Sequence, residues 1–373
     1  MMKIQHVHLS IIKMPLKSPF ANALETVTER ESIILEVIDH DGVAGYGEVV
    51  AFSTPWYTEE TVKTCYHLLK DVLIPIVLDR AIEHPKEISE RFQAVRGNPM
   101  AKAGIETAIW DLYAKRKNLP LWKLIGGTRE SVLSGVVVGT HDSKSALNQI
   151  EQFMLEGYER VKVKIKPGHD YDFLQLIRTH YPYLSLMADA NSSYTLNDLP
   201  LLKSLDRFNL LMIEQPLAVD DIVEHAALQK QMQTPICLDE SIVTYHDAES
   251  AIRLRSMGVL NIKIGRVGGL WNAIQLHNLC LKHSIPVWCG GMIEFGISRA
   301  FNIALATLEG FTIPGDISSS NRFWEKDIIT PEVHVRKGKI QAPMQAGIGF
   351  NINKKQLIAA TIYSEKIVKR GLQ

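Results

Sequence analysis

Apolar and charged residues alternate over residues 160–166, which read Arg-Val-Lys-Val-Lys-Ile-Lys. This period of two predicts a β-strand that carries Lys162, Lys164 and Lys166 on one face and the aliphatic side chains on the other. A charged face on a half-buried strand ordinarily points to solvent, so the stretch alone does not indicate a site. The segments that follow it change that interpretation.

Four apolar segments follow at a nearly constant interval, and each ends in a charged residue. They are residues 184–189, 210–214, 235–239 and 260–263, which end in Asp189, Glu214, Asp239 and Lys263. Counted from Lys164, the successive charged ends are 25, 25, 25 and 24 residues apart. One strand, one helix and their loops take about that many residues in a parallel barrel. The interval therefore predicts that these five charges meet at the mouth of a barrel, where such enzymes keep their chemistry.

Strand and helix patterns extend this unit in both directions. A glycine-bounded valine run at 135–139 is typical of a buried parallel strand, and residues 285–291 and 311–316 predict two further strands. We therefore expect an α/β barrel of eight strands, with little room for a helix after the last one. The amphipathic segments that predict helices between the strands include residues 170–179, 221–231 and 271–283.

The first part of the chain has a different pattern, with strands that precede helices. Strands are predicted at residues 3–12, 31–39 and 43–48, the last two joined as a hairpin. Helices are predicted at residues 58–69, beginning at a Thr58 cap, and at 85–95 and 100–118. This order indicates an α+β domain.

These patterns divide the chain into three parts. Residues 1–125 form the α+β domain, residues 126–320 the barrel, and residues 321–373 a segment without the barrel interval, which we expect to return to the first domain. No Gly/Ser-rich linker separates the parts, so we expect the two domains to be packed together.

Composition narrows the class of protein. Lysine plus arginine equals aspartate plus glutamate at 41 each, which gives no reason to expect a nucleic-acid or acidic-membrane partner. No uncharged apolar run approaches the roughly 18 residues of a membrane span, and the first residues are too polar for a signal peptide. The four cysteines are scattered and form no Cys-x-x-Cys pair, which indicates reduced thiols and a cytoplasmic protein.

The three carboxylates predict a metal site. Adjacent parallel strands lie about 4.8 Å apart, and three acids that close cannot all ionise unless a cation cancels their charge. Oxygen ligands favour a hard divalent cation, so we expect Asp189, Glu214 and Asp239 to bind Mg²⁺, with Mn²⁺ as a substitute. The competing interpretation of any one of these acids is a helix cap.

Lys164 and Lys263 lie on the strands at either side of the carboxylates, so they would flank a ligand held on the metal. A lysine beside another lysine and a cation has a lowered pKa, which suits a base at neutral pH. Lys162, behind Lys164 on the same strand face, would add like-charge repulsion. The competing interpretation of Lys164 alone is a solvated lysine at a strand end.

The loops at 17–22 and 51–57 are rich in aromatic residues, more so than free loops usually expose. We expect Phe20, Phe52, Trp56 and Tyr57 to close over the barrel mouth and contact the substrate. The alternative is that they pack the core of the first domain.

With these motifs in place, the chain resembles the enolase superfamily, in its muconate-lactonizing-enzyme-like subgroup. The matching motifs are Lys162-Val-Lys164, Asp189-Ala-Asn191, Glu214-Gln-Pro216, Asp239-Glu-Ser241 and Lys263, which is followed by Gly265-Arg266-Val-Gly-Gly269. Within the subgroup the chain is similar to the o-succinylbenzoate synthase / N-succinylamino-acid racemase family, through residues 56–60, 100–103, 288–294 and 314–318. The resemblance covers essentially the whole chain.

The resemblance implies a modified TIM barrel, (β/α)₇β, covered by an α+β capping domain and holding Mg²⁺ at the strand ends. It implies that Lys164 and Lys263 are the acid and base. Asn191 and Glu240 would support them from behind, and Arg266 would influence the charge state of Lys263. The backbone of Gly291, Met292 and Ile293 would hold a succinyl group.

The pattern also excludes relatives within the superfamily. Mandelate-racemase-like members place histidine where this chain has Lys164. Dipeptide epimerases carry Asp-x-Asp at the eighth strand, where Asp316 is followed here by isoleucine and serine.

The sequence leaves three functions open. We expect the protein to act on a small-molecule carboxylate and to be a homo-oligomer. The first is an o-succinylbenzoate synthase of menaquinone biosynthesis, which is a lyase. The second is an N-succinylamino-acid racemase that uses the same two lysines. The third is a non-catalytic scaffold, which loss of a carboxylate or lysine would favour, and none is lost.

Overall fold

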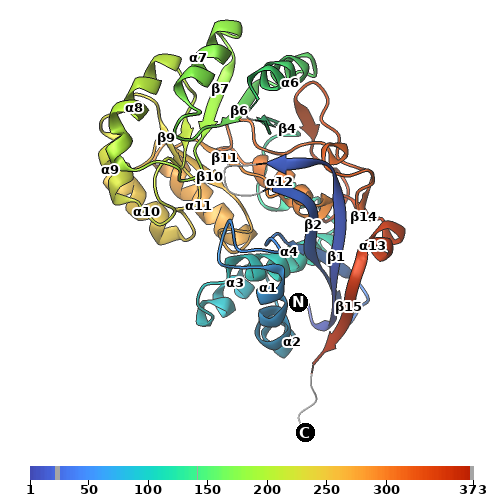
Figure 1. The fold of residues 1–373 in the computed structure, drawn as a ribbon. Coiled ribbons are helices and arrows are strands. Elements are labelled where there is room, and N and C mark those ends of the chain that lie inside the picture. The colour runs from blue at the N-terminus through green and yellow to red at the C-terminus, as the bar shows by residue number, and fades with distance from the viewer. Residues whose placement is uncertain (22–25, 141, 370–373) are drawn as a thin grey trace.

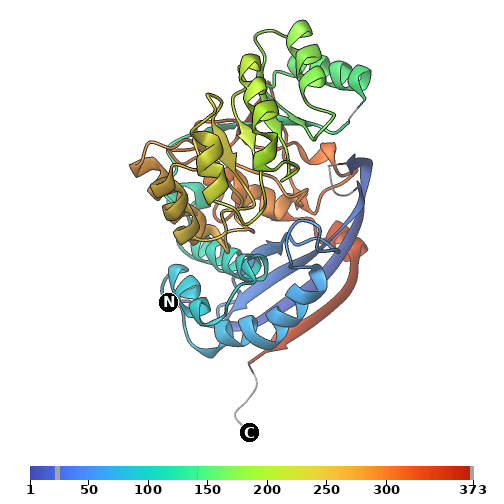
Figure 2. The ribbon, with the colours of Figure 1, turned by 60° about the vertical axis from the view of Figure 1, so that its left-hand side comes forward.

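The computed structural model describes residues 1–21, 26–140 and 142–369. An antiparallel sheet with its helices stands beside a barrel of parallel strands surrounded by helices (Figure 1). The expected α/β barrel with an α+β capping domain is confirmed. Figure 2 shows the antiparallel strands curving below one end of the barrel, where they cover its strand ends.

The capping sheet has the strand order β15-β1-β2-β3. Its strands are β1 (Ile4–Ala21), β2 (Thr26–Asp39), β3 (Ala44–Val49) and β15 (Thr361–Val368). The C-terminal strand β15 pairs antiparallel with β1, with His6 opposite Val368. The tail of the chain therefore completes the sheet that its first residues begin.

Strand β1 is longer than the sequence pattern predicts. Residues 17–21, expected in a loop, continue the pairing with β2 after an irregularity between Pro15 and Phe20, with Phe20 opposite Val27. The prediction of a loop was wrong there because residues 17–20 are mostly exposed, so no apolar alternation marks the strand. Asn22, the last residue of the predicted loop, lies outside the described residues.

The first helix begins three residues later than predicted. Its N-cap is Thr61 rather than Thr58, because the Thr61 hydroxyl accepts from the Thr64 N–H while the Thr64 hydroxyl accepts from the Thr61 N–H. The helices of the capping domain are α1 (Val62–Leu68), continued by a π-helical turn (Leu69–Leu73) into α2 (Ile74–Asp79), then α3 (Lys86–Arg91), α4 (Pro99–Arg116) and α5 (Leu121–Leu124).

Helix α4 lies directly against strand β3, which requires glycine on both sides. A Cβ atom added at Gly47 would stand 2.0 Å from the Gly104 carbonyl oxygen, and one added at Gly45 would stand 2.2 Å from that of Ala108. This close contact makes α4 almost wholly buried between the sheet and the barrel.

The barrel sheet holds seven parallel strands in the order β11-β10-β9-β8-β7-β6-β5. They are β5 (Val136–Val138), β6 (Arg160–Lys164), β7 (Ser185–Asp189), β8 (Ile213–Glu214), β9 (Ile236–Leu238), β10 (Val259–Ile262) and β11 (Val287–Cys289). The helices around it are α6 (Ser143–Leu155), α7 (Tyr171–His180), α8 (Leu199–Ser204), α9 (Val223–Gln229), α10 (Tyr245–Leu254), α11 (Leu270–Lys282) and α12 (Gly296–Ala306).

The predicted eighth strand at 311–316 is not a regular strand. It makes one parallel bridge to β11, Val287 with Phe311, and one between Ser134 and Gly315 beside β5. Pro314 interrupts the ladder because proline has no N–H to donate. The segment still closes the barrel between β11 and β5, since the Gly135 N–H donates to Gly315 and the Asp316 N–H to Cys289.

Short elements complete the chain. The remaining strands are β4 (Ser131–Leu133), which pairs with β13 (Lys339–Gln341), and β12 (Ile329–Thr330), which pairs with β14 (Asn351–Ile352). The remaining helix is α13 (Lys354–Ala360), and 3₁₀ turns lie at Phe92–Ala94, Leu196–Asp198, Leu205–Phe208 and Ser320–Arg322.

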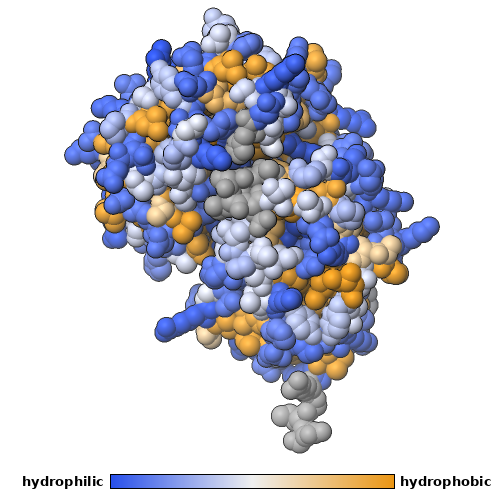
Figure 3. All heavy atoms as spheres, viewed as in Figure 1, coloured by the Kyte–Doolittle hydropathy of each residue, from blue (hydrophilic) through white to orange (hydrophobic). Residues whose placement is uncertain are grey.

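The surface is mixed. Figure 3 shows hydrophobic side chains in small separate groups among hydrophilic ones on the face of Figure 1. No helix in the described ranges is long and apolar enough to cross a membrane.

Two buried glutamates of the capping domain sit on the N-termini of barrel helices. Glu48 of β3 accepts from the N–H groups of Phe295 and Ser298 at the start of α12, both at 2.8 Å. Glu106 of α4 accepts from Leu270 and Trp271 at the start of α11, at 2.8 and 3.0 Å. The unpaired N–H groups of a helix start and its dipole favour a carboxylate there, so each glutamate ties one domain to the other.

Burial raises the pKa of both glutamates to about 7, although their backbone hydrogen bonds oppose that shift. Gly269 allows the approach of Glu106, because its φ is +130° and a Cβ atom there would stand 2.7 Å from Glu106 Oε2. The contact between the domains is thus specified by glycine as well as by glutamate.

We predict that Glu106→Ala lowers the free energy of unfolding by about 2–4 kcal/mol, because two helix N–H groups and the Trp110 indole N–H lose their acceptor in a buried place. Urea unfolding followed by circular dichroism measures it. The matched control is Glu90→Ala on the exposed side of α3, expected to stay within about 0.5 kcal/mol. Equal midpoints for the two variants would contradict the assigned role of Glu106.

Candidate active site

A cavity opens at the carboxyl ends of the barrel strands. Its walls come from both domains. The predicted site residues that line it are Phe20, Phe52, Trp56, Tyr57, Lys162, Lys164, Asp189, Asn191, Lys263, Gly291, Met292 and Ile293, joined by Val137 and Asp316. Residues far apart in the sequence are therefore brought to one place, as the interval of 25 residues predicts.

The three acidic strand ends are adjacent. Asp189 of β7 is the register partner of Glu214 of β8, and Glu214 is the partner of Cys237 on β9. Asp239 follows Cys237 by two residues and so points to the same face. All three carboxylates are buried, each at most 2% exposed.

Three lysines neutralise these acids. Lys162 Nζ lies 3.0 Å from Glu214 and 2.6 Å from Asp316. Lys164 Nζ donates to Asp189 and Lys263 Nζ to Asp239, both at 2.7 Å. Lys164 ends β6 and Lys263 directly follows β10, so the two outer lysines lie on opposite sides of the strands that carry the carboxylates.

Acidic neighbours and Tyr57 determine the direction of two lysine pKa shifts among the protein's own groups. Burial alone lowers the pKa of Lys162, but the neighbouring Asp316, Glu214 and Asp189 together raise it above the ordinary lysine value. Burial also lowers the pKa of Lys263, which its surroundings, Tyr57 foremost, raise overall. The lowered pKa predicted for a lysine beside a second lysine and a cation depends on that cation, so it stays a prediction.

The residues expected to support the lysines lie around them. Asn191 accepts from Lys164 Nζ at 2.7 Å and donates to Glu240 at 3.3 Å. Arg266 donates to Asp239, to the Ile242 carbonyl at 2.9 Å and to the Asn261 carbonyl. It is not bonded to Lys263, so any influence of Arg266 on that lysine passes through their shared partner Asp239.

The capping domain reaches the site through its aromatic residues. The Tyr57 hydroxyl lies 3.0 Å from Lys263 Nζ, which also stands 4.5 Å from the centre of the Tyr57 ring. Phe52 and Trp56 pack together with ring centres 4.5 Å apart. These side chains face the barrel mouth rather than only their own domain, as the closure prediction required.

Part of the Gly291–Ile293 backbone, which was expected to hold a succinyl group, already forms a hydrogen bond within the protein. The Met292 N–H donates to Glu294 Oε2 at 2.5 Å, so that donor serves the protein itself. Ile293 has a positive φ of 54°, a strained value for a β-branched residue. The turn is held in a fixed shape at the edge of the cavity.

Two site residues were missed by the sequence analysis. Asp316 pairs with Lys162 and with Arg160, each from 2.6 to 2.7 Å. Asn261 donates to Glu214 at 2.7 Å. Its place could have been found, since it precedes Lys263 by two residues and shares its strand face. Asp316 ends the predicted strand at residues 311–316, so it also stood at a strand end, but the constant interval of charged ends does not extend to it.

The donor set suits a hard divalent cation. No three acidic, histidine or cysteine side chains of the described chain converge as a preformed cage, because each carboxylate turns to a basic side chain. The three carboxylates nevertheless offer only oxygen atoms, and Glu240 Oε2 and Asn261 Oδ1 are buried near them without a hydrogen-bond partner among the described residues. Adjacent buried carboxylates with spare oxygens are the chemistry that such a cation prefers.

Comparison with protein families matches both domains. Residues 6–126 match the mandelate racemase / muconate lactonizing enzyme N-terminal domain, and residues 145–356 match the enolase C-terminal domain-like family. The two matches together span most of the chain.

Individual relatives match over nearly the full length. The chain is 52% identical to the o-succinylbenzoate synthase of Geobacillus stearothermophilus, covering 97% of each chain. It is 43% identical to the N-succinylamino acid racemase of Thermus thermophilus, covering 94% of this chain and 95% of that one. A solved structure of an enolase-superfamily member from Listeria innocua superposes with a TM-score of 0.97 at 42% identity, covering 99% of this chain and 100% of that chain.

We predict that Lys162→Met lowers the free energy of unfolding by about 3–5 kcal/mol in buffer with EDTA, because it leaves the buried carboxylate of Glu214 without a cationic partner. Denaturant titration measures the change. Lys166→Met is the matched control, since this exposed lysine follows on the same strand face and forms no ion pair within the described residues. A Lys162→Met protein as stable as this control would show that the carboxylates do not depend on Lys162.

Proposed function

Because the chain belongs to the mandelate racemase / muconate lactonizing enzyme family of the enolase superfamily, we propose that it is an o-succinylbenzoate synthase. This lyase dehydrates a succinyl-hydroxycyclohexadiene carboxylate to 2-succinylbenzoate. The observation that carries the proposal is the pair of lysines on opposite sides of three buried strand-end carboxylates. Relatives of that name at 44–52% identity over nearly the whole chain support it.

We propose Asp189, Glu214 and Asp239 as the ligands of Mg²⁺, with Mn²⁺ as a substitute. When bound, the cation supplies Lewis-acid stabilisation of the negative charge that develops on the substrate carboxylate. The protein's own contribution is to hold three anionic oxygen ligands on neighbouring strands, in a place from which the capping domain excludes water.

Charge balance supports a dianionic substrate. Five acidic side chains face five basic ones in the site, so the protein itself contributes no net charge there. They are Asp189, Glu214, Asp239, Glu240 and Asp316 against Arg160, Lys162, Lys164, Lys263 and Arg266. A divalent cation and a substrate with two carboxylates would enter together without disturbing that balance.

In the proposed reaction Lys164 removes the proton next to the substrate carboxylate. The same ammonium group can return that proton to the hydroxyl that departs as water, because both events occur on one face of the ring. Lys263, on the other side, stays protonated and stabilises the enolate charge.

A second candidate activity, racemisation of N-succinylamino acids, uses the same two lysines. One lysine removes the α-proton and the other returns a proton from the opposite face. The placement of Lys164 and Lys263 at the ends of β6 and β10 favours this activity as well, and relatives named N-succinylamino acid racemase support it.

Two further proposals concern where the enzyme is located and how it assembles. A cytoplasmic location is supported by the four cysteines, which are all unpaired thiols buried in the structure. We also retain the expectation of a homo-oligomer that acts on small carboxylates.

For the metal site, we predict that Asp189→Asn lowers Mg²⁺ affinity by about tenfold or more, because an anionic ligand becomes neutral. Calorimetric titration with Mg²⁺ measures affinity, and circular dichroism checks that the barrel is folded. Asp172→Asn, on the exposed face of α7, is the control and should bind as the wild type does. Unchanged affinity in Asp189→Asn would remove this residue from the ligand set.

For the lysines, we predict that Lys164→Ala abolishes both dehydration and racemisation. Lys263→Ala should abolish racemisation and slow dehydration by about 10²–10³-fold, as expected when one group that stabilises an oxyanion is lost. It should retain slow exchange of the enantiomer whose α-proton faces Lys164. Deuterium exchange of each enantiomer of an N-succinylamino acid, followed by NMR, and a spectroscopic dehydration assay measure these outcomes.

The control for the lysine variants is Lys166→Ala, which should retain wild-type rates. Exchange of both enantiomers at the wild-type rate in Lys164→Ala would refute the acid–base assignment. A wild-type enzyme without dehydratase activity would refute the proposed function.

A further inference from the structure

We infer that Arg322 binds the terminal carboxylate of the substrate's succinyl arm, in a second cavity that continues from the catalytic one. This inference rests on the proposed function and adds a residue that determines which acyl group is accepted. Arg322 lies in the C-terminal part of the chain, outside every motif by which the sequence indicated a site.

The second cavity lies directly beside the first. The two share the wall residues Phe20, Val137, Gly291, Ile293 and Asp316. The lysines line only the first cavity and Arg322 only the second. A substrate whose reacting carbon lies between the lysines can therefore extend an arm past Ile293 and Phe20 toward Arg322.

Arg322 is a cation without an acidic partner in the described part of the chain. Its Nη2 donates to the Val137 carbonyl at 2.6 Å, and no carboxylate forms an ion pair with it there. Its guanidinium lies over the rings of Phe153 and Phe323, 5.3 and 5.7 Å from their centres. An arginine held by apolar rings and a single carbonyl keeps donors available for an anion.

The acidic residues of this cavity are already satisfied elsewhere. Asp316 is neutralised by Arg160 and Lys162, at 2.7 and 2.6 Å. Glu294 accepts from the Met292 N–H and stands 3.7 Å from Arg299. Neither acid therefore forms an ion pair with Arg322, although Asp316 lies near enough to favour its charge.

A second guanidinium adds positive charge behind the cavity wall. Arg160 is fully buried, and its Nη1 has no hydrogen-bond partner. It stands directly behind Gly135, where an added Cβ atom would be 2.2 Å from the Arg160 Cζ. The absence of a side chain at Gly135 leaves the cavity lined by backbone at the place nearest this charge.

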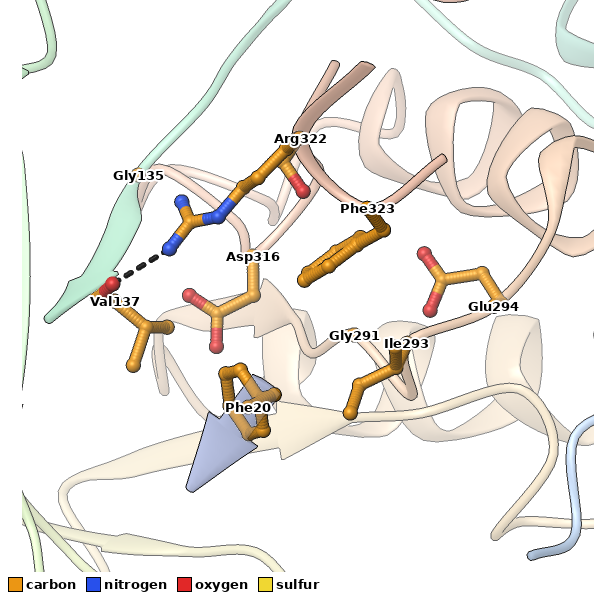
Figure 4. Close-up of a pocket in the computed structure, with 10 residues that line it drawn as sticks. Phe20, Gly135, Val137, Gly291, Ile293, Glu294, Asp316, Arg322 and Phe323 are labelled. Carbon is orange, nitrogen blue, oxygen red and sulfur yellow. Dashed lines mark hydrogen bonds between the residues drawn. The ribbon is translucent and has the colours of Figure 1, made fainter. Parts of the chain in front are cut away.

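The remaining walls suit a short aliphatic chain. Figure 4 shows Arg322 and Asp316 on one side of the space, Phe20 across from them, and Phe323 and Ile293 toward Glu294. The rings of Phe20 and Phe323 are 6.3 Å apart at their centres. Apolar walls that lead to a lone arginine match two methylene groups that end in a carboxylate, which is the succinyl arm.

The test compares two substrates that differ only in the charge of the arm. N-succinylmethionine carries the terminal carboxylate, and N-succinamoylmethionine carries a neutral amide of the same shape. We expect Arg322→Met to lower kcat/KM for the succinyl substrate by about 10- to 100-fold, the range of one charged hydrogen bond, chiefly through KM. The succinamoyl substrate should change by less than about threefold, because it has no charge to lose.

Two further variants complete the design. Arg322→Lys keeps the charge and should recover part of the preference for the succinyl arm. Arg207→Met, an arginine that contacts Tyr171 and Phe208 outside the barrel, is the matched control and should retain the wild-type preference.

Equal losses with both substrates in Arg322→Met would overturn the inference, since they would show a structural role. Unchanged kcat/KM with both would overturn it too, because the arm would then not reach Arg322. A wild-type enzyme that converts no N-acylamino acid and dehydrates no succinyl-hydroxycyclohexadiene carboxylate would instead refute the proposed function, and the inference with it.

Discussion

The requirement that buried carboxylates be neutralised governs this structure. Asp189, Glu214 and Asp239 are placed side by side by the register of three parallel strands, and burial removes the water that would screen them. Lys162 and its neighbours supply the opposing charge from the adjacent strands. The charges of these three acids are therefore balanced within the site, because each of the three carboxylates is paired with a basic side chain from another strand.

The capping domain is part of this arrangement rather than a separate cover. Glu48 and Glu106 join it to the barrel at two helix N-termini, and Tyr57 extends from it to Lys263. These contacts fix the position of the aromatic loop over the cavity relative to the strand ends. A shift of the capping domain would move the Tyr57 hydroxyl, so the domain contact and the lysine environment are linked.

Much of the fold and most of the site could be predicted from the sequence. Strand geometry produces the alternation that begins at Arg160, and barrel geometry produces the constant spacing of the charged strand ends. Both features are therefore visible as regular intervals in the sequence. The extension of β1 to Ala21 left no such trace, because the residues before it are exposed on both faces. Asp316 was missed although it ends a predicted strand, because the constant spacing of charged strand ends stops at Lys263.

The acidic neighbours of Lys162 could not all be predicted from the pattern either, because Asp316 approaches Lys162 from the far end of the barrel sequence. Arg322 is a similar case, since its environment of rings and one carbonyl arises only when the C-terminal part packs beside β5. Contacts between distant segments carry no period that a linear sequence can display.

The pairing of β1 with β15 sets the order in which the molecule can be completed. During synthesis the first strand emerges more than 350 residues before its partner, with His6 destined to lie opposite Val368. The barrel strands between them are made first and can pair locally with their neighbours in the chain. The capping sheet gains its last strand only after Val368 has left the ribosome, and that pairing closes a loop of more than 350 residues. A ribosome-bound chain can thus hold its charged strand ends in place while its capping sheet is still unfinished.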